Sequence, residues 1–431
     1  MSETPKNQPG QDRLARMQKT VKVHHAMEAK KALLVIEEEF PDNPEGMRYF
    51  YDKLRAYTEG KPFVPDGKKI VGTLCIHVPD EIIYAAGAVP VRLCSGAYAS
   101  DQVGAEFMPA KSCPLIKSTL GKIYLDMIPD SVMIVNPTTC DQKRKFGEIS
   151  GEFSDKFYML EVPPTKDSEE AREYWQRVVK RFAKALEKAT GTKITRKGMK
   201  AAISKVREAQ AQYRRFHNLR KHPQPLIWGK DAFIVANTYF FDDIDQWTKA
   251  LGWLNTELEG RIASGKSVGK PNSPRIIMSG SPSIFPNMKM PLLVEQLGAV
   301  IVADETCSSN RLLYDMVAAD ESYLYDMIPA VADRYLKPCT CPNFSPNTDR
   351  ERKLIEMAKT FAADGVIYQA FSGCQLYEME SRRIGKVLES HGIPMLYLET
   401  DYSPDDTGQL STRIEAFLES IKVRKRKGAV V

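Results

Sequence analysis

Residues 70–75, Ile-Val-Gly-Thr-Leu-Cys, form a short apolar run that ends at a cysteine. A helix-like segment over 80–87 follows it, and then a second apolar run over 89–93. Two more runs, over 131–136 and 157–162, continue the pattern. Strands that alternate with helices are typical of an α/β domain with a parallel sheet. The first half of the chain is therefore predicted to contain one α/β lobe.

The last third of the chain repeats this pattern. Short apolar runs without polar alternation predict strands that helices cover on both faces. Helix-like segments, among them 349–363 and 377–390, separate these runs, and a last helix is expected over about 411–423. The predicted strands are 275–278, 299–302, 365–368 and 394–398. A second α/β lobe with a parallel sheet is the expected result.

The chain has 431 residues, which indicates two or three domains. Long charged segments without strand signals, 168–219 and 233–263, predict a helical excursion from the first lobe, and Gly, Ser and Pro over 266–274 indicate a linker. We therefore expect an α/β protein of two Rossmann-like lobes with parallel sheets plus helical N-terminal and middle segments. The expected divisions are an N-terminal helical segment (1–65), a first α/β lobe with the excursion (66–265) and a second α/β lobe (266–431).

Composition excludes several classes of protein. Hydrophobic residues make up 43% and charged residues 27%, as in soluble globular proteins. No stretch approaches the roughly 20 apolar residues of a membrane span, and the polar N-terminus lacks the apolar core of a secretory signal. A cytoplasmic protein with reduced thiols is expected. The net charge of +6 owes much to the basic tail over 422–427, which is expected to be a solvated helix end, and we expect no nucleic-acid partner.

Eight cysteines form two sets that the long middle of the chain separates. Four of the eight closely follow predicted strands, and parallel sheets bind ligands beyond the carboxyl ends of their strands. Burial as small hydrophobes would explain one or two cysteines, with Cys94 the clearest case, but not all eight. A soft-metal or iron–sulfur site between the lobes is expected. The sets are Cys75, Cys94, Cys113 and Cys140, then Cys307, Cys339, Cys341 and Cys374.

Local context adds a few expectations. Pro114 places Cys113 at a predicted helix start, where free N–H groups favour a thiolate. The absence of C-x-x-C pairs argues against structural zinc and ferredoxin-type motifs, and no P-loop or G-x-G-x-x-G occurs. His77, two residues after Cys75, is a candidate proton donor, with hydrogen bonding in the core as the alternative. His217, like most other histidines, lies in a polar helical stretch and is expected to be solvated.

The same segments resemble the 2-hydroxyacyl-CoA dehydratase D-component family, which also contains benzoyl-CoA reductase subunits. The resemblance covers about residues 65–423, and its last block is specific. The segments that carry it are Val71–Cys75 with Pro79, Glu81, 85–87 and 90–93; Cys113–Ser118; Thr139–Asp141; and Leu398–Tyr402 with 409–417.

Within the family, the resemblance implies a single [4Fe–4S] cluster on three cysteines for dehydratase subunits. Cys307 and the Cys339-Thr340-Cys341 pair, taken with Cys75, look instead like the double-cubane cluster proteins. In that branch two cubanes share a bridging sulfide, giving an [8Fe–9S] cluster on six cysteines. Ser308-Ser309 departs from the expected Thr-Gly. Carried over by position, the ligands are Cys75, Cys113, Cys140, Cys307, Cys374 and Cys341, with Cys339 as the alternative to Cys341.

The resemblance implies an anaerobic, homodimeric reductase of a small molecule. A separate ATP-hydrolysing iron–sulfur activator protein would deliver the electrons at low potential. One alternative is a 2-hydroxyacyl-CoA dehydratase or benzoyl-CoA reductase subunit with a single [4Fe–4S] cluster. Another is a cluster-bearing electron-transfer protein with no substrate of its own.

Overall fold

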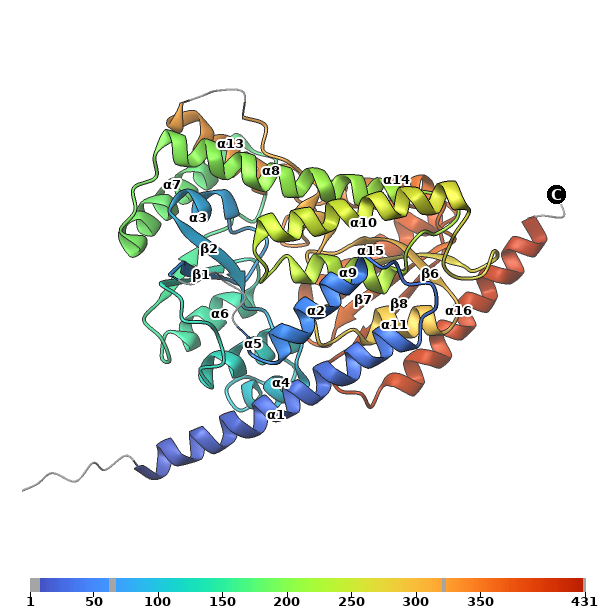
Figure 1. Cartoon of the computed structure of the whole chain (residues 1–431), viewed down its shortest axis with the longest axis horizontal. Helices are drawn as coiled ribbons and strands as arrows, with labels where there is room; N and C mark the ends of the chain where they lie inside the picture. Colours follow the sequence, from blue (N-terminus) through green and yellow to red (C-terminus); the bar gives the residue numbers. More distant parts are fainter. Residues whose placement is uncertain (1–7, 62–66, 320–322, 429–431) are drawn as a thin grey trace, which may run out of the picture.

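The computed structural model describes residues 8–61, 67–319 and 323–428, and it places two parallel four-stranded sheets in two lobes (Figure 1). The first sheet has the order β2-β1-β3-β4 and all of its pairs are parallel. Its strands are β1 Lys69–Thr73, β2 Ala88–Arg92, β3 Met133–Pro137 and β4 Phe157–Leu160. The predicted fold class, α/β with two Rossmann-like lobes, is confirmed.

The second sheet has the order β6-β5-β7-β8, again parallel throughout. Every residue of β5, β6 and β7 is buried, as expected for strands covered on both faces. The strands are β5 Arg275–Gly280, β6 Val300–Glu305, β7 Gly365–Phe371 and β8 Met395–Thr400. The helices of this lobe are α11 Lys289–Gln296, α12 Asn310–Leu313, α13 Leu324–Leu336, α14 Thr348–Thr360, α15 Gln375–Ser390 and α16 Thr407–Gly428.

Short helices connect the strands of the first lobe, and long ones form the predicted excursion. The short helices are α3 Asp80–Ala85, α4 Tyr98–Gly104, α5 Pro114–Tyr124 and α6 Asp141–Ser150. The excursion comprises α7 Glu169–Thr190, α8 Arg196–Leu219, α9 Gly229–Thr238 and α10 Ile244–Ser264. Helix α9 is wholly buried and packs on β6 of the second lobe, where a Cβ on Gly229 would lie 2.3 Å from the Ile301 Cβ. The excursion therefore joins both lobes.

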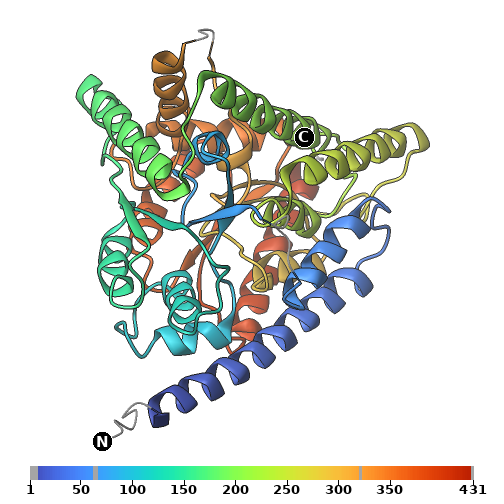
Figure 2. The same cartoon turned by 60° about the vertical axis from the view of Figure 1, so that its left-hand side comes forward.

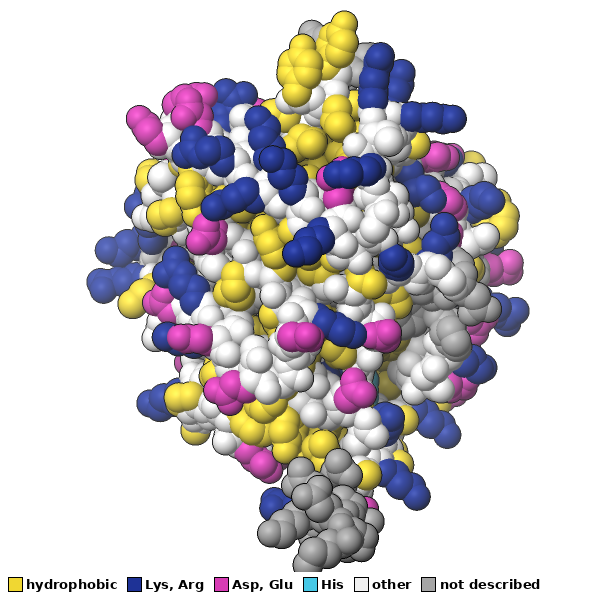
Figure 3. Space-filling model, turned by 90° about the vertical axis from the view of Figure 1, so that its left-hand side faces the viewer, with side chains coloured by type: hydrophobic (Ala, Val, Ile, Leu, Met, Phe, Trp, Pro, Cys, Tyr) yellow, Lys and Arg dark blue, Asp and Glu magenta, His cyan; other side chains and the backbone are white. Residues whose placement is uncertain are grey.

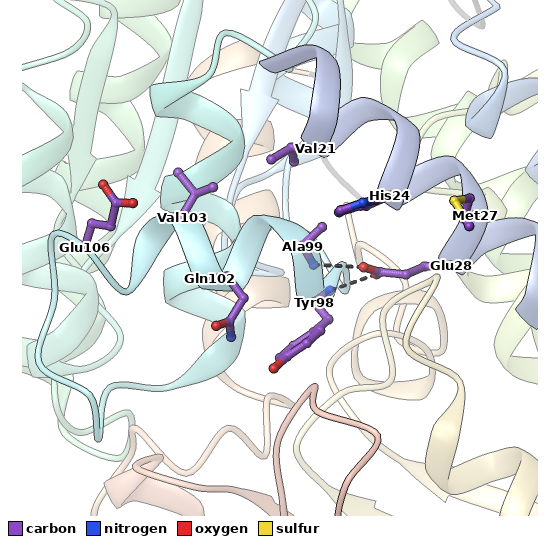
Figure 4. Close-up of a pocket in the computed structure, with 9 residues that line it drawn as sticks. All are labelled: Val21, His24, Met27, Glu28, Tyr98, Ala99, Gln102, Val103 and Glu106. Atoms are coloured by element: carbon purple, nitrogen blue, oxygen red, sulfur yellow. Dashed lines mark hydrogen bonds between the residues drawn. The ribbon is translucent and has the colours of Figure 1, made fainter. Parts of the chain in front are cut away.

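Two N-terminal helices, α1 Gln8–Glu38 and α2 Met47–Thr58, complete the chain. Helix α1 runs along one side of the molecule past both lobes (Figures 1 and 2). Its Glu28 carboxylate accepts hydrogen bonds from the N–H groups of Tyr98 and Ala99 at the start of α4, at 2.9 and 2.8 Å (Figure 4). At its other end, Gln296 of the second lobe donates to Glu39. Helix α1 therefore ties the lobes together.

The lobes meet through close backbone contacts. A Cβ on Gly96 of the first lobe would lie 1.7 Å from the Ile284 carbonyl oxygen of the second. Gly373 has φ +78°, and a Cβ there would lie 1.8 Å from the carbonyl oxygen of Lys111. Both positions therefore require glycine. The carboxyl ends of the strands in each lobe lie near this contact.

The outer surface carries both signs of charge. On the face turned toward the viewer in Figure 3, Lys and Arg side chains are interspersed with Asp and Glu. None of the helices in the described ranges is long and apolar enough to cross a membrane.

Candidate functional site

The cysteines lie where the strands end. In the first lobe, Cys75 and Cys94 come two residues after β1 and β2, and Cys140 comes three residues after β3. In the second, Cys307 follows β6 by two residues and Cys374 follows β7 by three. The carboxyl ends of parallel strands share one edge of a sheet, so each lobe gathers its cysteines at one edge. The two edges face each other.

A cavity of 310 Å³ lies between these edges, and seven of the eight cysteines line it. The lining also includes the side chains of Arg92, Lys143 and Tyr377. Cys94, expected to be a packing residue, is among the seven, and its thiol donates to the Leu74 carbonyl at 3.6 Å. The lining cysteines are Cys75, Cys94, Cys113, Cys140, Cys307, Cys341 and Cys374. The sequence therefore predicted correctly that the two distant sets meet.

Three of the cysteines also begin helices. Cys113 precedes α5, Cys140 precedes α6 and Cys374 precedes α15. The Cys140 sulfur accepts a hydrogen bond from the Lys143 N–H at 3.4 Å. The exposed N–H groups and the dipole at a helix start favour an anionic sulfur. The helix start predicted at Cys113 is confirmed.

The thiol set suits a cluster better than a single ion. No three His, Cys, Asp or Glu side chains in the described ranges are grouped so as to hold one metal ion. In a [4Fe–4S] cluster each thiolate binds a different iron, so the sulfurs surround the cluster and do not converge on a point. Seven cysteines spread around one cavity have this arrangement. The residues present therefore fit an iron–sulfur cluster.

Positive side chains favour an anionic sulfur at Cys75. Burial alone would raise the pKa of Cys75, but Lys143 and a hydrogen bond with His77 hold it well below its usual value. The Lys143 ammonium is buried and donates to the Leu74 carbonyl. Arg92 also lines the cavity, and its guanidinium donates to Thr73 at 3.2 Å. Neither cation was predicted, because nothing in the local sequence marks them.

Cys113 and Cys374 form a pair across the lobe contact. A hydrogen bond to Cys374, followed by burial, raises the pKa of Cys113 well above its usual value. The same bond lowers the pKa of Cys374 despite the opposing effect of burial. The Cys113 and Cys374 sulfurs, one from each lobe, therefore lie within hydrogen-bonding reach of each other.

Gln142 holds this pair in place. Its Oε1 accepts a hydrogen bond from the Cys113 N–H at 2.7 Å, and its Nε2 donates to the Gly373 carbonyl at 2.6 Å. One side chain from α6 thus links the backbone beside Cys113 in the first lobe to the backbone beside Cys374 in the second. Gln142 is a positioning residue that the sequence did not reveal.

Glu305 performs a similar role in the second lobe. Its fully buried carboxylate forms ion pairs with Arg311 at 2.5 Å and Arg350 at 3.2 Å, and accepts a hydrogen bond from Thr340 at 2.7 Å. These cations lower the pKa of Glu305 to about 2, against the opposing effect of burial. Glu305 lies two residues before Cys307, and Thr340 separates Cys339 from Cys341. The network therefore fixes the two cysteine loops relative to each other.

His77 lies behind the cavity wall. It is 1% exposed, and its ring nitrogens face two sulfurs, Nδ1 toward Cys75 and Nε2 toward Cys339, each at 3.5 Å. Neither His77 nor Cys339 is among the residues that line the cavity, whereas Cys341 is. This arrangement favours a hydrogen-bonding role for His77, and a catalytic role stays a prediction. It also favours Cys341 over Cys339 as a ligand.

A separate hollow between α1 and α4 contains no cysteine. Figure 4 shows it lined by side chains such as His24, Glu28 and Tyr98, with Glu28 bonded to the start of α4. Its residues serve the contact between these helices. The cysteine cavity is therefore the candidate site.

The chain is similar to known proteins over most of its length. The family model for 2-hydroxyglutaryl-CoA dehydratase, D-component, matches residues 75–421. The chain is 31% identical over 361 residues to “Putative dehydratase subunit YjiM” of Escherichia coli, covering 82% of this chain and 92% of that protein. It is 26% identical to the (R)-2-hydroxyglutaryl-CoA dehydratase, subunit beta, of Acidaminococcus fermentans, covering 82% and 93%. It is 23% identical to a subunit of the benzoyl-CoA reductase of Thauera aromatica, covering 86% and 95%.

Proposed function

The chain belongs to the 2-hydroxyglutaryl-CoA dehydratase, D-component, family, and we propose that it is a reductase whose cysteine cavity holds a double-cubane [8Fe–9S] cluster. The observation that carries the proposal is the single cavity lined by cysteines from both lobes. One [4Fe–4S] cluster on three cysteines would leave most of these thiols without a role. Proposed ligands are Cys75, Cys113, Cys140, Cys307, Cys341 and Cys374.

Such a cluster would supply one-electron chemistry at low potential. The residues of this chain bind and orient it. Lys143 and Arg92 offset the thiolate charge, the Glu305 network fixes the Cys307 and Cys341 loops, and Gln142 fixes Cys113 and Cys374. Each of these contacts is buried or partly buried.

The proposed reaction is an ATP-dependent reduction of a small molecule. Electrons would come from a separate ATP-hydrolysing iron–sulfur activator protein, because six thiolates make the addition of an electron unfavourable and this sequence contains no nucleotide-binding motif of its own. We also propose a homodimer and a cytoplasmic location, where thiols stay reduced and available for ligation.

A second candidate is a dehydratase or reductase subunit with one [4Fe–4S] cluster and a different partner subunit. The names of the relatives favour it, since the dehydratase of A. fermentans and the benzoyl-CoA reductase of T. aromatica are both described by subunit. Iron content distinguishes the two candidates. The double cubane requires roughly eight irons per chain and the single cubane about four.

The test is metal analysis of protein purified without oxygen. We expect roughly eight irons per chain in the wild type. Cys140→Ala is expected to lose most of its iron, and Cys307→Ala to lose at least half. About four irons, with Cys307→Ala unaffected, would favour the single cubane. Full iron retention by Cys140→Ala would remove the ligand assignment altogether.

The control variant is Cys94→Ala. Cys94 lines the same cavity but is not a proposed ligand, so the iron content of this variant should stay close to that of the wild type.

Activator dependence is tested separately, by reduction of a small substrate with a low-potential donor and ATP. Equal rates with and without activator would contradict the energy coupling but not the cluster.

A further inference from the structure

A second cavity, of 280 Å³, borders the loops that carry Cys307 and Cys341. Asn310, three residues after Cys307, forms part of its wall, as does Thr340, which adjoins Cys341. Helix α14 and the end of α8 form most of the remainder, together with Tyr314, Asp315 and Pro338. No residue that lines this cavity also lines the cysteine cavity. The same two loops therefore separate two distinct spaces.

Two buried polar groups in this wall have no hydrogen-bond partner among the residues that the structure describes. The Asn310 side chain is 1% exposed, and its Oδ1 has no donor among them. His217 is 5% exposed and its Nδ1 has no partner, so the expectation that this histidine is solvated is wrong. Helix α8 is charged overall, but His217 lies on its buried face beside Tyr213. Buried polar atoms in folded proteins are nearly always paired, and a ligand can supply the missing partner.

The cavity also offers positive charge. The Lys221 ammonium lies over the Phe361 ring at 5.9 Å, and that of Lys353 lies over the Tyr314 ring at 5.8 Å. Within the described ranges, neither lysine has a carboxylate within 4 Å. Two of the three acidic groups in the wall are already paired: Asp349 with Lys166 and Arg352, and Glu356 with Arg352; the third is Asp315.

The histidine in the wall is uncharged. Burial, followed by the nearby Arg220 and Lys221, holds the pKa of His217 well below its usual value. A neutral imidazole both donates and accepts one hydrogen bond. The wall therefore combines two lysines for an acidic group with Asn310 and His217 for a hydroxyl group.

We propose that this second cavity binds a small organic anion that carries a carboxylate or phosphate group and at least one hydroxyl. A cavity of 280 Å³ has room for about nine water molecules at about 30 Å³ each, so the ligand is small. Its hydroxyl would donate to Asn310, and Lys221 and Lys353 would bind its acidic group. Because Asn310 and Thr340 adjoin the cysteine loops, the ligand would contact both loops from outside the cysteine cavity.

The test is calorimetric titration of the full chain with two probes, glycerol 3-phosphate and glycerate. These probes share the hydroxyl groups and differ in the acidic group, so their order of affinity identifies which acid the cavity prefers. We expect saturable binding of at least one probe, and a tenfold or greater loss of affinity in both Lys221→Gln and Lys353→Gln. Lys386→Gln, which changes an exposed lysine on α15, is the matched control and should bind as the wild type does.

Two results would overturn the proposal. One is the absence of saturable binding of either probe to the wild type. The other is an equal loss of affinity in Lys386→Gln and Lys353→Gln, which would indicate non-specific attraction. Sulfate, which has no hydroxyl hydrogen to donate, should bind less tightly than the better probe; equal affinity would remove the role of Asn310. The measurement needs no iron, so its outcome is independent of the function proposed for the cysteine cavity.

Discussion

Replacing Glu305 by glutamine removes one negative charge from the most enclosed ion-pair network in the second lobe. The carboxylate is bonded to Arg311 through two atoms, at 2.5 and 2.8 Å, and also to Ser279 and Thr340. Glutamine keeps the shape of the side chain. Its amide N–H₂, however, must face groups that are themselves donors, and Arg311 is left buried without its counter-charge.

The expected loss follows from this geometry. Breaking a buried ion pair from one side costs about 3–5 kcal/mol, because a charge stays behind without a partner. Arg350 keeps a second carboxylate partner, Glu380 at 3.0 Å. Arg311 has no carboxylate partner other than Glu305 among the described residues, so it alone is left unpaired. We therefore expect a value near the lower limit, about 3 kcal/mol in the free energy of unfolding. This corresponds to roughly a hundredfold change in the folded-to-unfolded ratio.

Urea titration under anaerobic conditions measures this change, as the shift in midpoint at a common slope. The matched control is Glu351→Gln, which makes the same chemical change in the ion pair with Arg383. Arg383 is 61% exposed and Glu351 16%, so water screens this pair more than the pair of Glu305 with Arg311, where both side chains are 0% exposed. If Glu305→Gln loses no more stability than Glu351→Gln, the structural role assigned to the Glu305 network is wrong. Glu305→Gln should also lose iron, because the Cys307 and Cys341 loops would be displaced.

Three smaller changes test other contacts. Gln142→Ala removes two hydrogen bonds between the lobes and should cost about 2–4 kcal/mol, seen by urea titration together with faster loss of iron to a chelator; unchanged iron loss would argue against its positioning role. Burial raises the pKa of Glu295 from 4.5 to about 7. Between these two pH values the native state therefore binds more protons than the unfolded state does. The free energy of unfolding of the wild type should fall by about 3 kcal/mol as the pH rises through this range. In Glu295→Gln the urea midpoint should not show this fall between pH 5 and pH 8. An equal change of the midpoint with pH in the variant and the wild type would contradict the role of Glu295. Glu28→Ala removes the cap of α4 and should cost about 1 kcal/mol, with faster amide exchange at Tyr98 and Ala99; unaltered exchange there would show that the cap is dispensable.

The sequence predicted the two sheets because their strands are covered on both faces and therefore read as short, continuous apolar runs. The observed strands differ from the predicted ones by a few residues where a buried strand ends in polar residues. Strand β6 continues through Asp304 and Glu305, whose charges are paired with Arg220 and Arg311. The limits of α1 are hard to predict from the sequence for a different reason. Its covered face is a narrow stripe that includes Val21, Ala29 and Leu33, within a segment that is polar overall.

The meeting of the cysteines was predictable because parallel strands bring their carboxyl ends to one edge. Their supporting residues were not. Gln142 and Gly373 are bonded across 231 positions, and Glu305 and Thr340 across 35, so no local pattern relates them. Which member of the Cys339-Thr340-Cys341 pair faces the cavity was equally hidden, since an irregular loop has no periodicity to orient its side chains.

The division of the cysteines between lobes has a consequence for how the proposed cluster would bind. Three of the six proposed ligands come from each lobe, so the cluster would bind all of them only when the lobes are together. Binding free energy would then also be free energy of lobe association. The chain already holds the lobes together by other means, namely helix α9, the Gln142 bridge and the close approach of Gly96 to Ile284. With the lobes joined in this way, less of the binding free energy of the proposed cluster would be consumed in ordering its ligands. This arrangement explains why the glycines and hydrogen bonds at the lobe contact matter to the site even though most of them do not touch the cavity.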